Sequence, residues 1–362
     1  MQTDKPQSGD SGPPRRLEAG DHAAPFALPD QSGARATPLD DQAAGRPMLL
    51  VFLSGDAPER WAEDLAGFRD AQDEIATLGG LIFGITPCPV QVNGELHGAQ
   101  GLKFPLLSDP KGEVFNAYGL DPKRDRGRAT TLLLDRNFRV QELIVAKSGQ
   151  PQGAAALAAL QAAVAGEQPI TFGVHPPILV IPRVLAPEDC ARLIETWHRP
   201  VKVWSSDGLV SDGHDKETGD FKVSNESHGR VLHYVIRNPE LQTALDRKVG
   251  RRIGPEIRKA FQTSVSKREE YRIACYDSAE SGNLPAHRDN PTPKTKHRRF
   301  TLVVALNGGE YQGGELRFRE YGPHSYSAET GTAIIWSAAL LHEVGAVTAG
   351  RRFMLGTHLY GE

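Results

Sequence analysis

The amino-acid sequence predicts two domains, an α/β domain followed by a β-rich barrel that carries helices on one side. Its 362 residues are long for a single domain. Strand-like and helical segments alternate in the first half, whereas in the second half helical segments come first and short apolar segments follow. A Gly- and Pro-rich stretch separates the two halves. We expect a disordered tail over 1–16, the first domain over 17–166, a linker over 167–177 and the second domain over 178–362.

The bulk composition excludes several classes of protein. A hydrophobic content of 39% and a charged content of 24% are typical of soluble globular domains, and a net charge of −3 disfavours a nucleic-acid partner. No apolar run approaches the roughly 20 residues of a membrane span, and the polar N-terminus lacks the apolar core of a secretion signal. Cys88, Cys190 and Cys275 are too widely spaced for a disulfide framework or a zinc site. We therefore expect a cytoplasmic protein without a membrane partner.

The first domain alternates buried strands with helices. Its apolar runs are continuous, which is typical of strands that are buried on both faces, and Asp135-Arg136-Asn137 indicates a hairpin turn. The expected elements are a strand over 47–54, a helix over 58–78, a strand over 81–86, paired strands over 130–134 and 140–145, and a helix over 153–165.

Two segments of this domain, 24–33 (Ala-Pro-Phe-Ala-Leu-Pro-Asp-Gln-Ser-Gly) and 104–119, closely resemble the opening and middle segments of peroxiredoxins. The resemblance covers roughly 17–166 and implies a thioredoxin-like fold. Peroxiredoxins carry their peroxide-reducing cysteine at the start of the helix after the first long strand. At that place this chain has Asp56-Ala-Pro-Glu-Arg-Trp61, so the aligned position falls on Arg60 or Trp61.

Neither residue at that position can attack a peroxide, so we do not expect a peroxidase here. Arg128 is then a relic of the family's arginine, without the thiolate that it would activate. The expected role of the domain is docking or recognition. Cys88 is an ordinary loop cysteine or a displaced redox thiol. The second option leaves a thiol-dependent peroxidase as an alternative function.

The second domain has helices first and strands afterwards. Pro187 suits the first residue of a helix over 188–197, and Pro255 is expected to interrupt a helical stretch over 238–261. Strands are expected over 178–184, 271–276, 300–306, 314–318, 333–336 and 353–359. This order predicts a double-stranded β-helix, or jelly roll, buttressed by helices, and the mouth of such a barrel can hold a ligand.

Three residues of the second domain form the outline of a mononuclear iron site. His287 and Asp289 are two positions apart, so both side chains can point to one face of an extended segment. His342 lies 55 positions after His287. Two imidazoles and one carboxylate on one face of an octahedral Fe(II) leave the other face open for a co-substrate and dioxygen. The other candidates for the third ligand, His297, His324 and His358, are not followed by an arginine at the same spacing.

An arginine ten positions after His342 is the candidate clamp for the co-substrate. The guanidinium of Arg352 can bind a carboxylate through two parallel hydrogen bonds. Arg351 competes with it, but strand alternation turns only one of them inward, and we favour Arg352. Tyr276 either donates its hydroxyl to the same carboxylate or packs in the core. Cys275 precedes Tyr276 on the same strand, so its side chain points to the opposite face, and it is expected to be a buried thiol.

The motifs Ala274-Cys-Tyr, His287-x-Asp-Asn-Pro, Gly313-Gly-Glu-Leu-Arg-Phe and His342-Glu-Val are similar to segments of the hypoxia-inducible-factor prolyl hydroxylases and other prolyl-4-hydroxylase-like oxygenases. The match extends over roughly 178–360. It implies Fe(II) at His287, Asp289 and His342, 2-oxoglutarate at Arg352 with help from Tyr276, and ascorbate as a further cofactor.

The implied reaction is the hydroxylation of a peptidyl side chain, with proline as the leading candidate and succinate and carbon dioxide as products. A catalytically silent sensor of 2-oxoglutarate or oxygen is the other alternative. Two further features concern the substrate. The basic run 294–299 is a solvated loop or an entry funnel for an anionic substrate, and the long polar segment 205–229 is a candidate lid.

Overall fold

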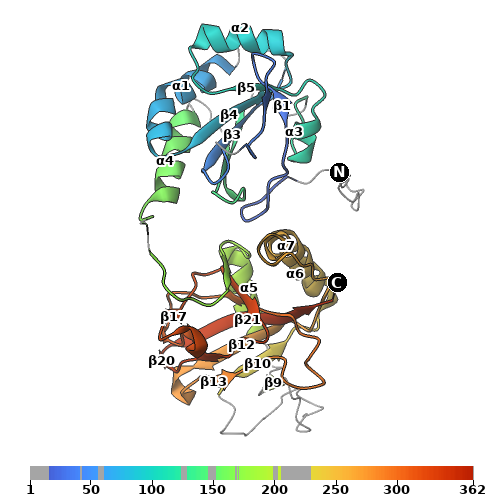
Figure 1. Cartoon of the computed structure of the whole chain (residues 1–362), viewed down its shortest axis with the longest axis vertical. Coiled ribbons are helices and arrows are strands. Elements are labelled where there is room, and N and C mark those ends of the chain that lie inside the picture. Colours follow the sequence, from blue (N-terminus) through green and yellow to red (C-terminus); the bar gives the residue numbers. More distant parts are fainter. Residues whose placement is uncertain are drawn as a thin grey trace. The chain divides into compact units, whose positions relative to one another are not determined.

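The structure is a computed structural model that describes residues 16–40, 43–55, 61–123, 129–145, 152–167, 169, 171–198, 203–204 and 230–361. The chain divides into two compact units, 1–169 and 170–362, and each is described by itself (Figure 1). The predicted tail up to residue 15, the predicted relic Arg128 and the predicted lid over 205–229 lie outside the described residues.

The first unit is built on a five-stranded sheet in the order β5-β4-β3-β6-β7. Strands β3 and β4 and strands β4 and β5 are parallel, whereas β3 pairs with β6 and β6 pairs with β7 in antiparallel fashion. The strands are β3 (Met48–Leu53), β4 (Leu81–Thr86), β5 (Leu106–Ser108), β6 (Ala129–Leu134) and β7 (Val140–Val145), with a small hairpin of β1 (Leu28–Pro29) and β2 (Arg35–Ala36). This arrangement confirms the predicted thioredoxin-like fold.

Strand β3 is apolar throughout because both of its faces are covered. Leu49, Val51 and Leu53 pack in a core with side chains of α1 (Ala62–Thr77) and α4 (Gln152–Val164), and Figure 1 shows these two helices side by side. Leu50 and Phe52 belong to the opposite core, which α3 (Glu113–Ala117) closes. Helix α2 (Val90–Gln100) follows β4 and was not predicted.

The second unit consists of two antiparallel sheets. The larger has the order β8-β18-β14-β21-β12-β10-β9, with β11 also paired to β21, and the smaller has the order β13-β19-β16-β17. The larger sheet contains β8 (Leu179–Ile181), β9 (Val203–Trp204), β10 (Leu232–Val235), β11 (Lys267–Arg268), β12 (Arg272–Asp277), β14 (Phe300–Ala305), β18 (Ala333–Ser337) and β21 (Arg351–Tyr360). The smaller contains β13 (Leu284–His287), β16 (Leu316–Arg317), β17 (Ser325–Tyr326) and β19 (His342–Val344), and β15 (Gln312–Gly313) pairs separately with β20 (Val347–Ala349). This is the predicted helix-buttressed jelly roll.

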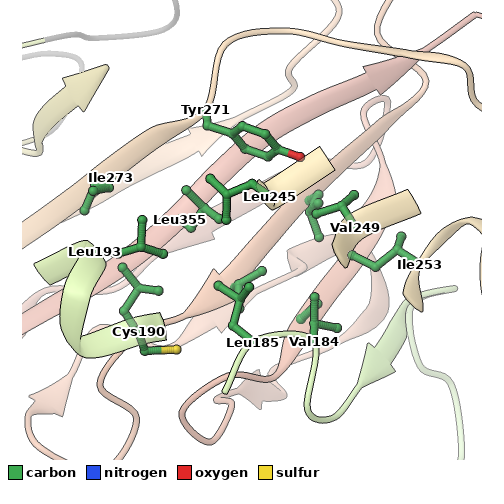
Figure 2. Close-up of a cluster of buried hydrophobic side chains, with 14 of the residues drawn as sticks. Val184, Leu185, Cys190, Leu193, Leu245, Val249, Ile253, Tyr271, Ile273 and Leu355 are labelled. Carbon is green, nitrogen blue, oxygen red and sulfur yellow. The ribbon is translucent and has the colours of Figure 1, made fainter. Parts of the chain in front are cut away.

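Strand alternation divides the second unit into an outer and an inner core. Ile273, Cys275 and Leu355 pack with residues of the helices α5 (Pro187–Trp197), α6 (Pro239–Arg252) and α7 (Gly254–Phe261), and Figure 2 shows this cluster between helices and sheet. The intervening residues Ala274 and Tyr276 turn into the other core, which includes side chains of the smaller sheet. Residues at even positions of β12 therefore face the interior of the barrel.

Two predicted strands are shorter than expected. The segment 178–184 forms only the three residues of β8, because Arg183 adopts a left-handed backbone with φ +57°. The segment 314–318 forms only β16, because Gly313 and Gly314 have φ values of +74° and +71°. A left-handed residue cannot continue an extended strand.

Candidate functional site

His287, Asp289 and His342 are brought together at the smaller sheet. His287 is the last residue of β13 and His342 the first residue of β19, and the two are direct cross-strand neighbours. Their ring centroids are 4.4 Å apart, and Asp289 follows two positions after His287. One ligand atom from each of the three side chains lies within 4.8 Å of the others. The turn after β13 therefore places the carboxylate beside both rings.

Backbone carbonyls fix the orientation of both imidazole rings. Nδ1 of His287 lies 2.8 Å from the carbonyl oxygen of Pro285, and Nδ1 of His342 lies 3.0 Å from that of Leu340. A carbonyl can only accept, so Nδ1 must donate and Nε2 keeps its lone pair. The Nε2 atoms lie 3.4 Å and 3.5 Å from the two carboxylate oxygens of Asp289. This tautomer and its backbone support are typical of metal-binding histidines.

Asp289 is held by three further hydrogen bonds. The hydroxyl of Thr301 donates to its Oδ2 at 2.5 Å, and the Arg298 guanidinium donates to its carbonyl oxygen at 2.9 Å. Its own N–H donates to the carbonyl of Ala338 at 2.9 Å. The sequence analysis did not select Thr301, although a polar residue in an otherwise apolar strand was a usable signal.

The protonation states of the cluster suit a metal ion. Burial alone would raise the pKa of Asp289, but its contact with the His287 side chain and the proximity of the His342 and His358 rings lower it well below its usual range. Burial lowers the pKa of His342. At neutral pH the carboxylate is charged and this imidazole is neutral, and those are the forms that bind metals.

The prediction that the basic run 294–299 is a solvated loop or an entry funnel was wrong for Arg298. This side chain is only 6% exposed, and it donates to both carboxylate oxygens of Glu269 at 2.7 and 2.8 Å. Although burial would raise the pKa of Glu269, the hydrogen bonds from Arg298 lower it. Arg298 therefore links Asp289 to Glu269 through hydrogen bonds in the protein interior.

Arg352 faces the interior and Arg351 faces outward. Arg352 is 6% exposed, and its Nη1 atom is buried without a hydrogen-bond partner among the described residues. Arg351 is exposed and pairs with Asp277 at 2.6 Å. The interior guanidinium is thus the one with unused hydrogen-bonding capacity.

Two tyrosines surround the Arg352 guanidinium. Tyr276 is its cross-strand neighbour, and the guanidinium carbon lies 5.2 Å from the Tyr276 ring centroid. Nε of Arg352 donates to the hydroxyl of Tyr311 at 3.2 Å, a contact that the sequence analysis missed because Tyr311 is 41 positions away. Burial raises the pKa of Tyr276, which keeps its hydroxyl protonated.

A single cavity joins the three-residue cluster to Arg352 and Tyr276. It contains about 930 Å³ of space, part of it open to solvent, and all five predicted site residues line it. Of the competing histidines, His358 also lines this cavity but is not part of the cluster. His297 bonds to Glu269 at 2.9 Å, and His324 is exposed.

None of the three cysteines is in a disulfide. Cys88 is 8% exposed and lies after β4, where it lines a hollow together with Lys111 and Lys123. Cys190 and Cys275 lie in the outer core of the second unit. Trp61 is 1% exposed, and its indole N–H donates to the carbonyl of Ser54 at 3.0 Å.

Comparison with known proteins matches each half of the chain to a protein family. Residues 19–143 match the model of the AhpC/TSA family, and residues 271–360 match that of the 2OG-Fe(II) oxygenase superfamily. A protein of Mycobacterium tuberculosis that is named as a peroxiredoxin is 33% identical over 128 residues, which are 35% of this chain and 80% of that protein. The chain belongs to the AhpC/TSA family and carries a 2OG-Fe(II) oxygenase domain.

Two solved structures are similar to parts of this chain. The crystal structure of the peroxidoxin BcpB from Mycobacterium tuberculosis covers 41% of this chain and 98% of its own, with 28% identity and a TM-score of 0.36. The crystal structure of a Pseudomonas putida prolyl-4-hydroxylase covers 52% of this chain and 94% of its own, with 16% identity and a TM-score of 0.38.

The His-Asp-His cluster and Arg352 lie inside the segment that matches the oxygenase superfamily, whereas Cys88 and Trp61 lie inside the AhpC/TSA domain. The oxygenase superfamily implies Fe(II) and 2-oxoglutarate, and the cluster fits a metal site. In the described part of the chain, no helix combines the length and the apolar character needed to cross a membrane.

Proposed function

We propose that the chain is an Fe(II)- and 2-oxoglutarate-dependent dioxygenase that hydroxylates a C–H bond of its substrate. The observation that carries this proposal is one cavity shared by a His-Asp-His cluster and a buried arginine with an unused donor. The cluster offers a metal three ligands, and the arginine offers a carboxylate a binding group at a separate place. A chelating dicarboxylic acid needs both.

The described residues fit the two implied groups. His287, Asp289 and His342 would hold Fe(II), since the backbone carbonyls accept from Nδ1 of both rings and the Nε2 atoms face the carboxylate oxygens of Asp289. Arg352 would bind the distal carboxylate of 2-oxoglutarate, with Tyr276 and Tyr311 beside it. Gly314 leaves the space that the arginine occupies, because a Cβ there would lie 3.0 Å from Cδ of Arg352.

When bound, iron with 2-oxoglutarate supplies the oxidising chemistry that converts 2-oxoglutarate, dioxygen and substrate to succinate, carbon dioxide and hydroxylated product. The protein's own residues would bind and orient the metal, the co-substrate and the substrate. Thr301 fixes one carboxylate oxygen of Asp289, and the apolar walls formed by Leu316, Trp336 and Val344 restrict access of water.

A peptidyl side chain, with proline first, is the substrate that we propose to test. In this proposal the AhpC/TSA domain, with the predicted bounds 17–166, is a docking module for the substrate protein. Of the two residues expected at the place of the peroxiredoxin cysteine, Arg60 lies outside the described residues, and Trp61 is the N-cap of α1 with a buried indole, which supports a role other than peroxide reduction. Ascorbate would be added to the assay to keep the iron ferrous.

The test is the visible absorption of the anaerobic protein with Fe(II) during a titration with 2-oxoglutarate. We expect a metal-to-ligand charge-transfer band in the wild type, no band in His342→Ala, and a 2-oxoglutarate Kd about 30-fold weaker or more in Arg352→Met, because a buried charge loses its partner. Arg351→Met is the matched control and should bind as the wild type does. A folded, iron-loaded protein without the band would contradict the proposal.

A thiol-dependent peroxidase remains the second candidate, favoured by the AhpC/TSA match and by the position of Cys88 in a hollow with two lysines. Its test is peroxide consumption with a dithiol reductant. Consumption that persists unchanged in Cys88→Ser would eliminate it. A third outcome, 2-oxoglutarate binding without succinate formation in the presence of a broad peptide library, would favour a silent sensor.

A further inference from the structure

The cavity has a second polar wall that the proposed function does not use. His233 on β10, Arg272 on β12 and His358 on β21 all line it. Strand β10 pairs with β12, and β12 pairs with β21, so the three residues lie on adjacent strands of the larger sheet. Arg272 has the same strand parity as Ala274 and Tyr276, and His358 the same parity as Arg352 and Met354. Alternation therefore turns all three residues to the interior face.

Gly356 leaves empty space in the middle of this wall. It lies directly opposite Arg272 in the register of β12 and β21, and two positions before His358. A Cβ built on Gly356 would meet only the carbonyl oxygen of Leu302, at 3.9 Å. The space in front of the Arg272 guanidinium is therefore not filled by a side chain from the facing position.

The polar groups of this wall have hydrogen-bonding capacity that the protein does not use. Both ring nitrogens of His233 are buried without a hydrogen-bond partner among the described residues. The Arg272 side chain is mostly buried and makes no hydrogen bond to any described residue. Such groups cost free energy in a folded protein unless a ligand or water satisfies them.

The nearby acidic groups do not neutralise Arg272 by direct contact. Glu269 is engaged through both carboxylate oxygens by Arg298. Glu270 is exposed, and its nearest ion pair is with Arg237, at 3.8 Å. Both act on Arg272 only through the longer-range attraction of unlike charges. The cavity lining in this region thus combines the Arg272 guanidinium and two imidazole rings with the side chains of Glu269 and Glu270, neither of which bonds directly to Arg272.

We propose that Arg272, His233 and His358 form a subsite that holds a carboxylate of the primary substrate beside the metal cluster. The guanidinium can donate two parallel hydrogen bonds to a carboxylate, and a neutral imidazole can donate a further one. The oxidised C–H bond then belongs to an acid: a free amino acid or related small acid, the C-terminus of a peptide, or an acidic side chain. This inference rests on the proposed function.

The test is anaerobic isothermal titration calorimetry of the full chain loaded with Fe(II) and 2-oxoglutarate. The probes are the free L-amino acids, their N-acetyl derivatives, and N-acetyl-L-aspartate amide, each compared with the corresponding neutral primary amide. We expect at least one acid to bind while its amide does not. Binding of free amino acids alone indicates a small substrate, and binding of N-acetyl acids or of the aspartate derivative indicates a peptide.

Three variants locate the binding. Arg272→Met should weaken the Kd of the acid about tenfold or more, because a charged hydrogen bond is lost. Gly356→Ala should weaken binding by placing a methyl group in the space opposite Arg272, where its Cβ meets only the carbonyl oxygen of Leu302, at 3.9 Å. Arg351→Met, on the outward face, should leave the Kd unchanged.

Equal binding of acid and amide, an unchanged Kd in Arg272→Met, or no binding of any acid at millimolar concentration would overturn the subsite. The charge-transfer band of the same samples separates the two ideas. If the band is present and no acid binds, only the subsite fails. If the band is absent, the proposed function itself fails.

Discussion

At Asp289, burial and hydrogen bonding act on the carboxyl group in opposite directions. Burial favours the neutral acid, whereas the contact with His287 and the neighbouring imidazole rings favour the carboxylate, and their combined effect lowers the pKa of Asp289. Thr301 contributes a short hydrogen bond at 2.5 Å that is lost if the hydroxyl is removed. Thr301, which is not a proposed metal ligand, thus fixes the position of Asp289, which is one.

Thr301→Val keeps the volume and removes the hydroxyl. We expect the affinity for Fe(II), or for Mn(II) as a stable substitute, to fall about 10- to 100-fold, because partners of metal ligands have effects of this size. Calorimetric titration of the metal into the metal-free protein measures it. Thr348→Val is the control, since Thr348 is exposed on β20. Equal affinities in all three proteins would show that the hydroxyl does not position Asp289.

His233 makes the stability of the second unit depend on pH. Burial and the charge of Arg272 lower the pKa of this ring to about 3. Below its unfolded pKa of about 6.5, the unfolded chain binds a proton that the folded protein does not, so stability falls as the pH falls. We expect the free energy of unfolding to decrease by at most about 2 kcal/mol between pH 8 and pH 5 from this residue.

Denaturant unfolding of wild type and His233→Leu at both pH values measures this contribution as the difference between the two pH dependences. A variant whose stability falls as steeply with pH as that of the wild type would show that His233 is protonated when folded.

At the scale of elements, the sequence predicted those strands and helices that have a regular apolar pattern or a clear start signal. Strands β3 and β4 are apolar on both faces, and α5 begins at a proline. Helix α2 was missed because Asn93 is its only fully buried residue among those described, so it has no apolar stripe. Strand β16 was predicted too long because Gly313 and Gly314 bend the chain before it.

A substitution at Gly314 tests whether the backbone just before β16 controls the position of Arg352. Its φ is +71°, and a Cβ would lie 2.8 Å from Val347 and 3.0 Å from Arg352. We expect Gly314→Ala to lower the free energy of unfolding by about 1–2 kcal/mol from backbone strain and also to weaken 2-oxoglutarate binding by displacing Arg352. Gly309→Ala is the matched control, with φ +87° and nothing within 4 Å.

The two glycine variants separate strain from displacement. Denaturant unfolding should show a loss in both, larger in Gly314→Ala because of the contact with Val347, whereas the charge-transfer titration should show a weaker Kd in Gly314→Ala alone. A weaker Kd in both would mean that strain in this part of the barrel, rather than contact with Arg352, controls co-substrate binding.

For the whole molecule, the sequence predicted three side chains that lie together in the structure, but not the residues that surround them. The spacing of His287, Asp289 and His342 could be recognised because a two-residue step on an extended segment has a known geometry. Tyr311 and Glu269 could not, since nothing local in the sequence reports which distant residues meet Arg352 and Arg298. Long-range pairing of strands decides those contacts.

Every described residue of the proposed site lies in the second unit. We therefore expect a fragment of residues 170–362 to show the charge-transfer band with the 2-oxoglutarate Kd of the full chain. Its activity on a substrate protein should be lower if the AhpC/TSA domain docks that protein, and its activity on a short peptide should not change. Loss of the band in a folded fragment would show that the first unit contributes to the site.

The facing histidines of β13 and β19 have a consequence for the lifetime of the protein. The smaller sheet has no strand longer than four residues, so few backbone hydrogen bonds hold it. An ion bound between His287 and His342 would fasten two of these strands directly to each other. Without iron the sheet should open more often and become more accessible to proteases. Cellular iron supply would then govern how much of this protein persists, as well as whether it is active.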